Sequence, residues 1–339
     1  MNRPQPGRGC RPVLRGATGR SSRPPARHGP VVRDDTPRPT VRRDDGLAAL
    51  VLTRHLPSEV RAWRRAGAIS RVRRGAYTIA GPSRGAALDR EERASAYIEA
   101  VAAQLRSDYW FSHESAALVW GCGIVGLSGR THVTQEWCSS TRGDPRLVRH
   151  TIDLPPAERT VWRGLPVTTL ARTAVDCATS MTGRHGLVVV DSALRLGADP
   201  EEIRSILGAR AGGRGVRRAR IVVARADQKS ESPGESLVRW EILDAGLPTP
   251  ELQVVVHTTS GTYRLDLAWS AARVAVEFDG YVKYSGGFGA APDVVFAEKR
   301  RQDALEAAGW IVVRVTWDDL RDPGPTIARI RRALSTRLS

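Results

Sequence analysis

Residues 264–280 of this chain read RLDLAWSAARVAVEFDG. Polar and apolar side chains alternate on both sides of residues 270–273, so the stretch predicts two strands joined in a β-hairpin. If the turn is symmetric about residues 271 and 272, residues whose numbers sum to 543 face each other, and Asp266 lies opposite Glu277. Directly opposed residues have Cβ atoms about 4.5–5.5 Å apart, and two unpaired carboxylates repel at that separation. The stretch therefore predicts a cation between Asp266 and Glu277.

The two faces of the predicted hairpin differ in chemistry. Alternation places Asp279 on the same face as Glu277 and directs the apolar residues to the opposite face, into a core: Leu265, Leu267, Trp269, Val274, Val276 and Phe278. Hard carboxylate oxygens suit Mg²⁺ or Mn²⁺. Such an ion lowers the pKa of a bound water and neutralises charge on a scissile phosphate. The acidic face therefore predicts phosphodiester hydrolysis.

Two further residues are candidates for this site. Glu235 lies in the first turn of an expected helix, where it either supplies a third metal-binding carboxylate or closes a capping box with Ser232. Lys283 follows four residues after Asp279 and either offers a positive charge to the phosphate or is a solvent-exposed lysine. The predicted metal ligands are Asp266, Glu277 and Glu235, and the predicted catalytic residues are Glu235, Asp266, Glu277, Asp279 and Lys283.

The elements around the hairpin predict the fold of residues 232–339. In order, the pattern gives a helix at 233–245, strands at 252–258, 263–269 and 273–279, a helix at 293–308, a strand at 311–316 and a final helix after Pro325. Helix, three strands, helix and strand is the α-β-β-β-α-β core order of restriction-endonuclease-like folds. We therefore expect an α/β domain here, within a chain that is α+β overall.

The N-terminal part has the pattern of a DNA-binding unit. Residues 46–55 and 57–65 predict two short helices, and residues 68–79 alternate across a glycine as a small hairpin does. Together they predict a winged helix-turn-helix over residues 46–82. Its candidate phosphate contacts are Arg61, Arg64 and Arg65 on one side of the second helix and Arg71, Arg73 and Arg74 on the wing. The alternative is a solvated basic face.

Charge supports a polyanionic partner. The 339 residues carry a formal net charge of +16 and a pI of 10.8, which favours nucleic acid. Residues 1–45 hold eleven arginines and four aspartates with few large apolar residues, so we expect a disordered tail, or a segment upstream of the true start. No apolar run approaches the roughly 18–20 residues of a membrane span, so we expect a cytoplasmic protein without membrane contact.

The middle region, residues 86–227, is expected to mix helices and strands, and its role is left open. His113 is either a catalytic histidine or the residue after a serine N-cap at Ser112, and His150 has no evident partner in the sequence. The four cysteines lack the paired spacing of zinc sites, so we expect reduced thiols.

The C-terminal motifs resemble a known nuclease family. The segments Gly234-Glu235-Ser236, 264–269, 276–280 and 309–314, with Arg301 and Leu305 ahead of the last, are similar to the Vsr-like (very-short-patch-repair) branch of PD-(D/E)xK nucleases. The resemblance covers the last third of the chain and implies a metal-dependent endonuclease. The Glu-x-Lys motif of that superfamily here reads Glu277-Phe278-Asp279, so Lys283 either substitutes for the missing lysine or the activity is altered or lost.

The rest of the chain resembles a second family. The winged-helix pattern, together with FSHESAA at 111–117 and LPVTTLARTAVD at 165–176, is similar to AbiEi-type antitoxins of type IV toxin–antitoxin systems. This resemblance implies promoter binding and a cognate toxin. Two hypotheses follow: a Mg²⁺-dependent DNA endonuclease, or a DNA-binding regulator or antitoxin whose nuclease-like domain is catalytically impaired. The oligomeric state and the target sequence are left open.

Overall fold

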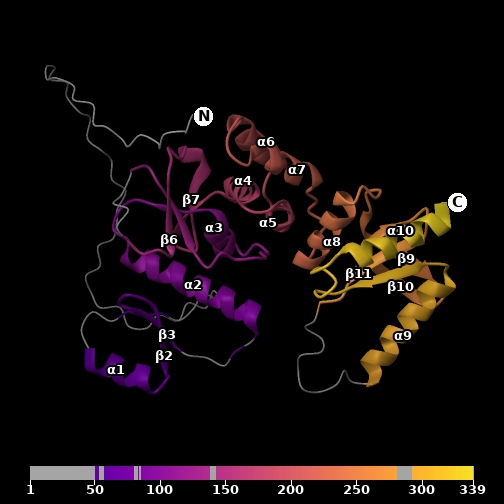
Figure 1. Cartoon of the computed structure of the whole chain (residues 1–339), viewed down its shortest axis with the longest axis horizontal. Coiled ribbons are helices and arrows are strands. Elements are labelled where there is room, and N and C mark those ends of the chain that lie inside the picture. The colour runs from indigo at the N-terminus through magenta and orange to yellow at the C-terminus, as the bar shows by residue number, and fades with distance from the viewer. Residues whose placement is uncertain are drawn as a thin grey trace, which may run out of the picture. The chain divides into compact units, whose positions relative to one another are not determined.

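The computed structural model of the chain describes residues 50–52, 57–79, 83, 85–137, 143–280 and 292–338 (Figure 1). These residues fall within one compact unit and combine helices with three sheets, so the fold is mixed α/β. The tail predicted at residues 1–45 and the candidate Lys283 lie outside the described residues. Within the described part of the chain, no helix has the length and apolar character that crossing a membrane requires.

The N-terminal elements form a small sheet beside one helix. They are β1 (Leu50–Leu52), α1 (Pro57–Arg65), β2 (Ile69–Arg73) and β3 (Ala76–Ile79), with strand order β1-β3-β2. The predicted second helix and the hairpin are therefore confirmed. The helix predicted over residues 46–55 is wrong where it is described, because residues 50–52 form a strand antiparallel to β3. Three apolar residues in a row fit either a strand or a buried helix, and here pairing with the hairpin decides the outcome.

The middle region packs helices against a five-stranded sheet of order β6-β5-β4-β8-β7. The strands are β4 (Trp110–Phe111), β5 (Thr131–Gln135), β6 (Leu147–Thr151), β7 (Arg159–Trp162) and β8 (Leu165–Thr168). The helices are α2 (Ala86–Gln104), α3 (His113–Trp120), α4 (Leu170–Ser180), α5 (Gly183–Arg195), α6 (Pro200–Ala209) and α7 (Val216–Arg225). Local sequence sets several of these boundaries. Thr169 caps α4 by accepting the backbone N–H of Arg172, and Asp199 caps α6 immediately before Pro200.

The C-terminal elements follow the predicted order of helices and strands. They are α8 (Pro233–Asp244), β9 (Glu251–Thr258), β10 (Gly261–Trp269), β11 (Val274–Phe278), α9 (Pro292–Ala307), β12 (Ile311–Val315) and α10 (Gly324–Leu338). The strand order is β12-β11-β10-β9, in which β11 and β12 run parallel and the other pairs antiparallel. The predicted register of the hairpin is confirmed, because Leu267 pairs with Val276 and these numbers sum to 543.

The C-terminal sheet is buried on both faces, which corrects the prediction of one apolar and one acidic face. Leu267 and its neighbours pack with apolar residues of α8 and α10, whereas Leu265 packs on the opposite face with Leu305 of α9. Side chains change faces between these two leucines because the pairing of β9 with β10 skips Asp266 and Gln253. Gln253 has a φ of 55°, a left-handed conformation that interrupts the regular alternation of the strand.

A buried ion pair joins the middle region to α8. Asp191 of α5 accepts a hydrogen bond from Arg239 (Nη2 to Oδ2, 2.5 Å), and both side chains are almost completely buried. The same carboxylate accepts from the Ser236 hydroxyl at 2.7 Å and from the backbone N–H of Asp227 at 2.9 Å. Val188 of α5 adds an apolar contact to the core beneath β10 and β11. The predicted boundary at residues 227–232 is therefore crossed by buried contacts.

Candidate functional site

Five of the six arginines predicted to contact DNA are exposed. They are Arg61, Arg64 and Arg65 on α1 and Arg71 and Arg74 on the β2–β3 hairpin. The spacing of i, i+3 and i+4 places the three on α1 along one side of the helix. A groove lined in part by Arg71, Arg74 and Arg146 runs from the hairpin to the middle region. Exposed guanidinium groups in this arrangement can bind phosphate oxygens.

The sixth arginine has a different environment. Arg73 donates to Asp144 (Nε to Oδ2, 2.9 Å) and to Gln104 (Nη1 to Oε1, 3.1 Å). Tyr97 also donates to Asp144, and the Gln104 amide donates to the backbone carbonyl of Arg74 at 2.9 Å. Arg73 therefore links the hairpin to the middle region. Its guanidinium already binds Asp144 and Gln104, unlike those of the five exposed arginines. The sequence pattern did not separate it from its neighbours because Asp144 is 71 residues away.

Asp266 is the carboxylate with the most perturbed ionisation in the C-terminal sheet. Its Oδ2 accepts the backbone N–H of Phe278 at 2.9 Å, across the hairpin. Burial, together with the negative charges of Glu235 and Glu277, raises the pKa of Asp266 to about 6, while the hydrogen bond from Phe278 and the charge of Arg301 oppose the rise. Glu235 and Glu277 thus both lie close enough to Asp266 to influence its ionisation.

Glu277 is paired with an arginine from the facing helix. Arg301 of α9 donates to both carboxylate oxygens, with Nη1 at 2.7 Å from Oε2, and also to the backbone carbonyl of Arg264 at 3.1 Å. Glu277 is only 8% exposed, so this bidentate pair compensates a charge that is largely removed from water. The cation that the hairpin predicts beside its acids is present here as a guanidinium.

Of the remaining predicted residues of this site, Glu235 and Asp279 make hydrogen bonds within the protein, and Lys283 lies outside the described residues. Ser232 accepts the N–H of Glu235 at 3.2 Å, and Glu235 Oε2 accepts from the N–H of Glu231 and from Gln253 Nε2, both at 2.9 Å. Ser232 therefore caps the helix as the capping alternative predicts, but the Glu235 carboxylate accepts the N–H of Glu231 and not that of Ser232, so the reciprocal bond of a capping box is not made. Asp279 is half-buried and donates its backbone N–H to the carbonyl of Val315 at 2.8 Å.

The predicted acids do not fit a divalent ion in this arrangement. Both oxygens of Glu277 bind Arg301, one oxygen of Asp266 binds a backbone N–H, and one oxygen of Glu235 accepts two hydrogen bonds. Across residues whose placement is described, these carboxylates do not supply three ligand atoms within 4.8 Å of one another. Binding of Mg²⁺ by these acids would first require Arg301 to release Glu277.

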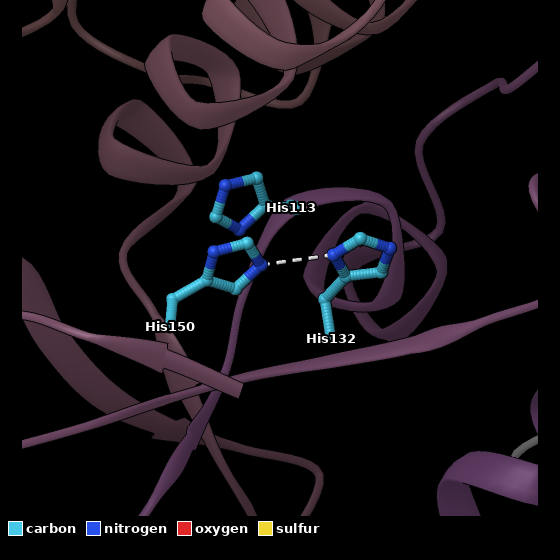
Figure 2. A group of neighbouring side chains, drawn as sticks. All are labelled: His113, His132 and His150. Carbon is cyan, nitrogen blue, oxygen red and sulfur yellow. Dashed lines mark hydrogen bonds between the residues drawn. The ribbon is translucent and has the colours of Figure 1, made fainter. Parts of the chain in front are cut away.

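Three histidines of the middle region do lie this close together, although no motif in the sequence connects them. His113 begins α3, His132 lies in β5 and His150 in β6, and each offers a ring nitrogen within 4.8 Å of the other two. In Figure 2 the imidazole of His113 lies over that of His150, and a dashed line joins His132 to His150. The stacked ring centroids are 3.9 Å apart, and the hydrogen bond between His132 Nδ1 and His150 Nε2 is 3.0 Å long. We name these residues the histidine cluster. The sequence offered one hint of this cluster. Three of the seven histidines fall at short elements that follow one another closely along the chain, α3, β5 and β6.

Burial keeps the histidine cluster neutral. It lowers the pKa of His132 to about 3 and that of His150 to about 4, and the pKa of His113 is also lowered. Asp176 opposes the shift in all three cases. Ser112 occupies the N-cap position of α3 but makes no side-chain cap bond, and its hydroxyl lies 3.0 Å from His113 Nδ1. Ser112 is therefore at the predicted N-cap position, but the capping hydrogen bond expected from its side chain is not made.

The carboxylate beside the histidine cluster is held by two arginines. Asp176 of α4 accepts from Arg172 (Nε, 2.9 Å) and Arg210 (Nη1, 2.6 Å), both through Oδ1. The other oxygen, Oδ2, is buried without a hydrogen-bond partner. Charge on Arg172 and Arg210, together with the neighbouring His113, lowers the pKa of Asp176 against the effect of its complete burial.

The middle region, which contains the histidine cluster, is also the part of the chain that matches a known protein family. Residues 124–223 match the AbiEi antitoxin C-terminal domain family. This antitoxin-like segment contains residues 165–176, part of the motif on which the antitoxin resemblance was based, and it includes His132, His150 and Asp176.

Similar proteins come from Mycobacterium tuberculosis. The uncharacterized protein Rv2248 of strain H37Rv and the uncharacterized protein MT2308 of strain CDC 1551 are each 35% identical over 174 residues, which is 50% of this chain. The chain spans about 62% of the length of these relatives. The crystal structure of the Rv2827c protein of the same species is similar at a TM-score of 0.31 and 17% identity, over 58% of this chain and 71% of that one.

Proposed function

We propose that this protein is a DNA-binding regulator of the antitoxin type with a cognate toxin as its partner. The observation that carries the proposal is the match of residues 124–223 to the AbiEi antitoxin C-terminal domain. The net charge of +16 and the exposed arginines of α1 and the hairpin support a polyanionic ligand. In this proposal residues 46–82 form a winged DNA-binding unit, and residues 86–227 carry the antitoxin function.

The proposed contact with DNA is mainly electrostatic, between arginine side chains and phosphate groups. Arg61, Arg64 and Arg65 bind phosphates along one side of α1, and Arg71 and Arg74 extend the contact from the hairpin. Each phosphate neutralised by an arginine releases counterions, so the logarithm of the affinity falls with the logarithm of the salt concentration by about 0.9 per contact. Arg73 contributes indirectly, since its pair with Asp144 holds the hairpin in place.

Salt-dependent DNA binding tests this assignment. The triple variant Arg61→Ala, Arg64→Ala, Arg65→Ala should bind DNA more weakly at every sequence, with a salt slope smaller by about 3. The matched control removes three equally exposed charges around α7, at Arg214, Arg217 and Arg220. It should leave the slope unchanged. An unchanged slope in the α1 variant, or a loss only in the α7 variant, would remove α1 from the DNA interface.

Regulation requires preference for particular DNA. We expect the full chain to bind the DNA upstream of its own gene at least tenfold more tightly than a scrambled duplex of equal length and composition. Coexpression with the protein encoded beside it tests the antitoxin part, because an antitoxin restores growth that its toxin arrests. Equal affinity for both duplexes and no effect on growth would refute the proposal.

A second candidate function is a metal-dependent endonuclease of the Vsr-like, restriction-endonuclease-like class over residues 232–339. It is favoured by the two carboxylates that act on Asp266 and by the raised pKa of Asp266, since perturbed carboxylates are common at active sites. The pairing of Glu277 with Arg301 weighs against it. Plasmid nicking in Mg²⁺ or Mn²⁺ by the wild type, abolished by Asp266→Ala, would support the nuclease. Equal cleavage by both proteins would exclude this site, and no cleavage by either would leave the regulator.

A further inference from the structure

We propose that His113, His132 and His150 form a binding site for a divalent transition-metal ion of the Zn²⁺ class, with three imidazole ligands and an open fourth position. The proposal rests on the atoms of the histidine cluster and is independent of the DNA-binding function.

The backbone already brings the three side chains to one place. β5 and β6 are parallel, and Thr134 pairs with His150, so His132 and His150 lie diagonally on the same face of the sheet. His113 comes from the start of α3, which packs on β5. Tetrahedral zinc with Zn–N bonds of about 2.0–2.1 Å needs ligand nitrogens roughly 3.3 Å apart. The nitrogens here lie within 4.8 Å, and one pair is at 3.0 Å, so small side-chain rotations suffice.

One buried oxygen beside the cluster lacks a hydrogen-bond partner within the described structure. Asp176 Oδ2 is shielded from solvent without a hydrogen bond, whereas His132 Nε2, which points away from the other two rings, lies 3.8 Å from Glu114 Oε1. Native proteins rarely leave such a buried oxygen unpaired, and a nearby ion or water is one recognised explanation. A metal ion between the three rings would be bound by the lone pairs of the ring nitrogens that lie within 4.8 Å of one another. Asp176, which is completely buried, supplies the outer carboxylate that commonly receives the second N–H of a metal-bound histidine.

The backbone of the cluster also favours metal binding. His113 has a φ of 54°, a left-handed conformation uncommon for residues other than glycine. Such conformations persist where the surrounding structure fixes them and gather at ligand sites.

The donor set selects the class of ion. Three nitrogen ligands suit Zn²⁺, Co²⁺, Ni²⁺ or Cu²⁺, whereas Mg²⁺ prefers oxygen. Three protein ligands with a free position are the arrangement of zinc sites that bind an exchangeable water or substrate. The competing explanation is that three neutral rings stack and hydrogen-bond as ordinary packing.

The test uses the full chain, free of any affinity tag and stripped with a chelator. Zn²⁺ bound after equilibrium dialysis should approach one ion per chain, and Co²⁺ should give the visible absorption of a tetrahedral site. The single variants His113→Ala, His132→Ala and His150→Ala should each weaken Zn²⁺ binding at least 100-fold. The matched control is His257→Ala, which removes an exposed histidine of β9 and should bind as the wild type does.

A thermal measurement separates metal binding from packing. Zn²⁺ should raise the melting temperature of the wild type and of His257→Ala, and should leave that of His150→Gln, a polar variant chosen to keep the fold, unchanged. No Zn²⁺ or Co²⁺ bound by the folded wild type would overturn the proposal. Equal binding by the wild type and a variant lacking all three histidines would overturn it as well.

Discussion

Asp266→Asn should make the protein more stable at neutral pH and no more stable at acidic pH. The asparagine side chain keeps an oxygen that can accept the N–H of Phe278, so the geometry of the hairpin is preserved. It removes a negative charge that is half-buried beside Glu235 and Glu277. A charge kept in such a place lowers stability, and proteins retain such charges where function requires them.

The size of the effect follows from the pKa of Asp266, which burial raises from 3.8 to about 6. At 1.36 kcal/mol per pH unit, that difference corresponds to about 3 kcal/mol. Partial contact with solvent reduces the expected value to about 2 kcal/mol. Below the unfolded pKa of 3.8 the carboxyl is mostly protonated in the folded and unfolded chains alike, so its contribution to stability is fully present. That stability is lost as the pH rises through about 6, because ionisation is easier in the unfolded chain.

The assay is urea unfolding of the wild type and Asp266→Asn, followed by tryptophan fluorescence at several pH values between 4 and 8 without metal. The free-energy difference should grow from near zero to about 2 kcal/mol in favour of the variant. Asp318→Asn, at an exposed carboxylate, serves as the control and should show little change across this range. A difference that is constant with pH, or a variant that is less stable at pH 8, would refute the reasoning.

Two further predictions concern the stability of the fold around the candidate sites. Arg239→Met should destabilise the chain by about 3–5 kcal/mol, because it leaves the Asp191 charge buried and unpaired. The loss should grow as the pH rises, since burial already raises the pKa of Asp191, and adding Asp191→Asn should restore most of the stability in thermal unfolding. Gly215→Ala should cost more than about 2 kcal/mol, because its φ is +80° and a Cβ would lie 2.0 Å from the carbonyl oxygen of Thr179. Gly212→Ala, with a φ of +79° and open space around the new Cβ, should cost only about 1 kcal/mol. Equal losses at the two glycines would contradict the predicted clash.

Local patterns predicted the secondary structure where periodicity was long and the ends were marked. The C-terminal order and the register of the hairpin follow from alternation and turn symmetry, and the observed pairing of Leu267 with Val276 agrees with that register. Residues 50–52 were assigned wrongly because three apolar residues carry no period. Leu265 was placed on the wrong face because regular alternation cannot anticipate the interruption opposite Gln253.

The sequence by itself determined the charge of the chain, most of its helices and strands, and the register of the hairpin that carries Asp266 and Glu277. Only the tertiary structure decided which charges are paired and which polar groups meet. Arg301 reaches Glu277 from 24 residues away, Arg73 reaches Asp144 from 71, and three histidines from separate elements share one site. Local spacing reports contacts within one helix or one hairpin, whereas these contacts depend on how whole elements pack against one another.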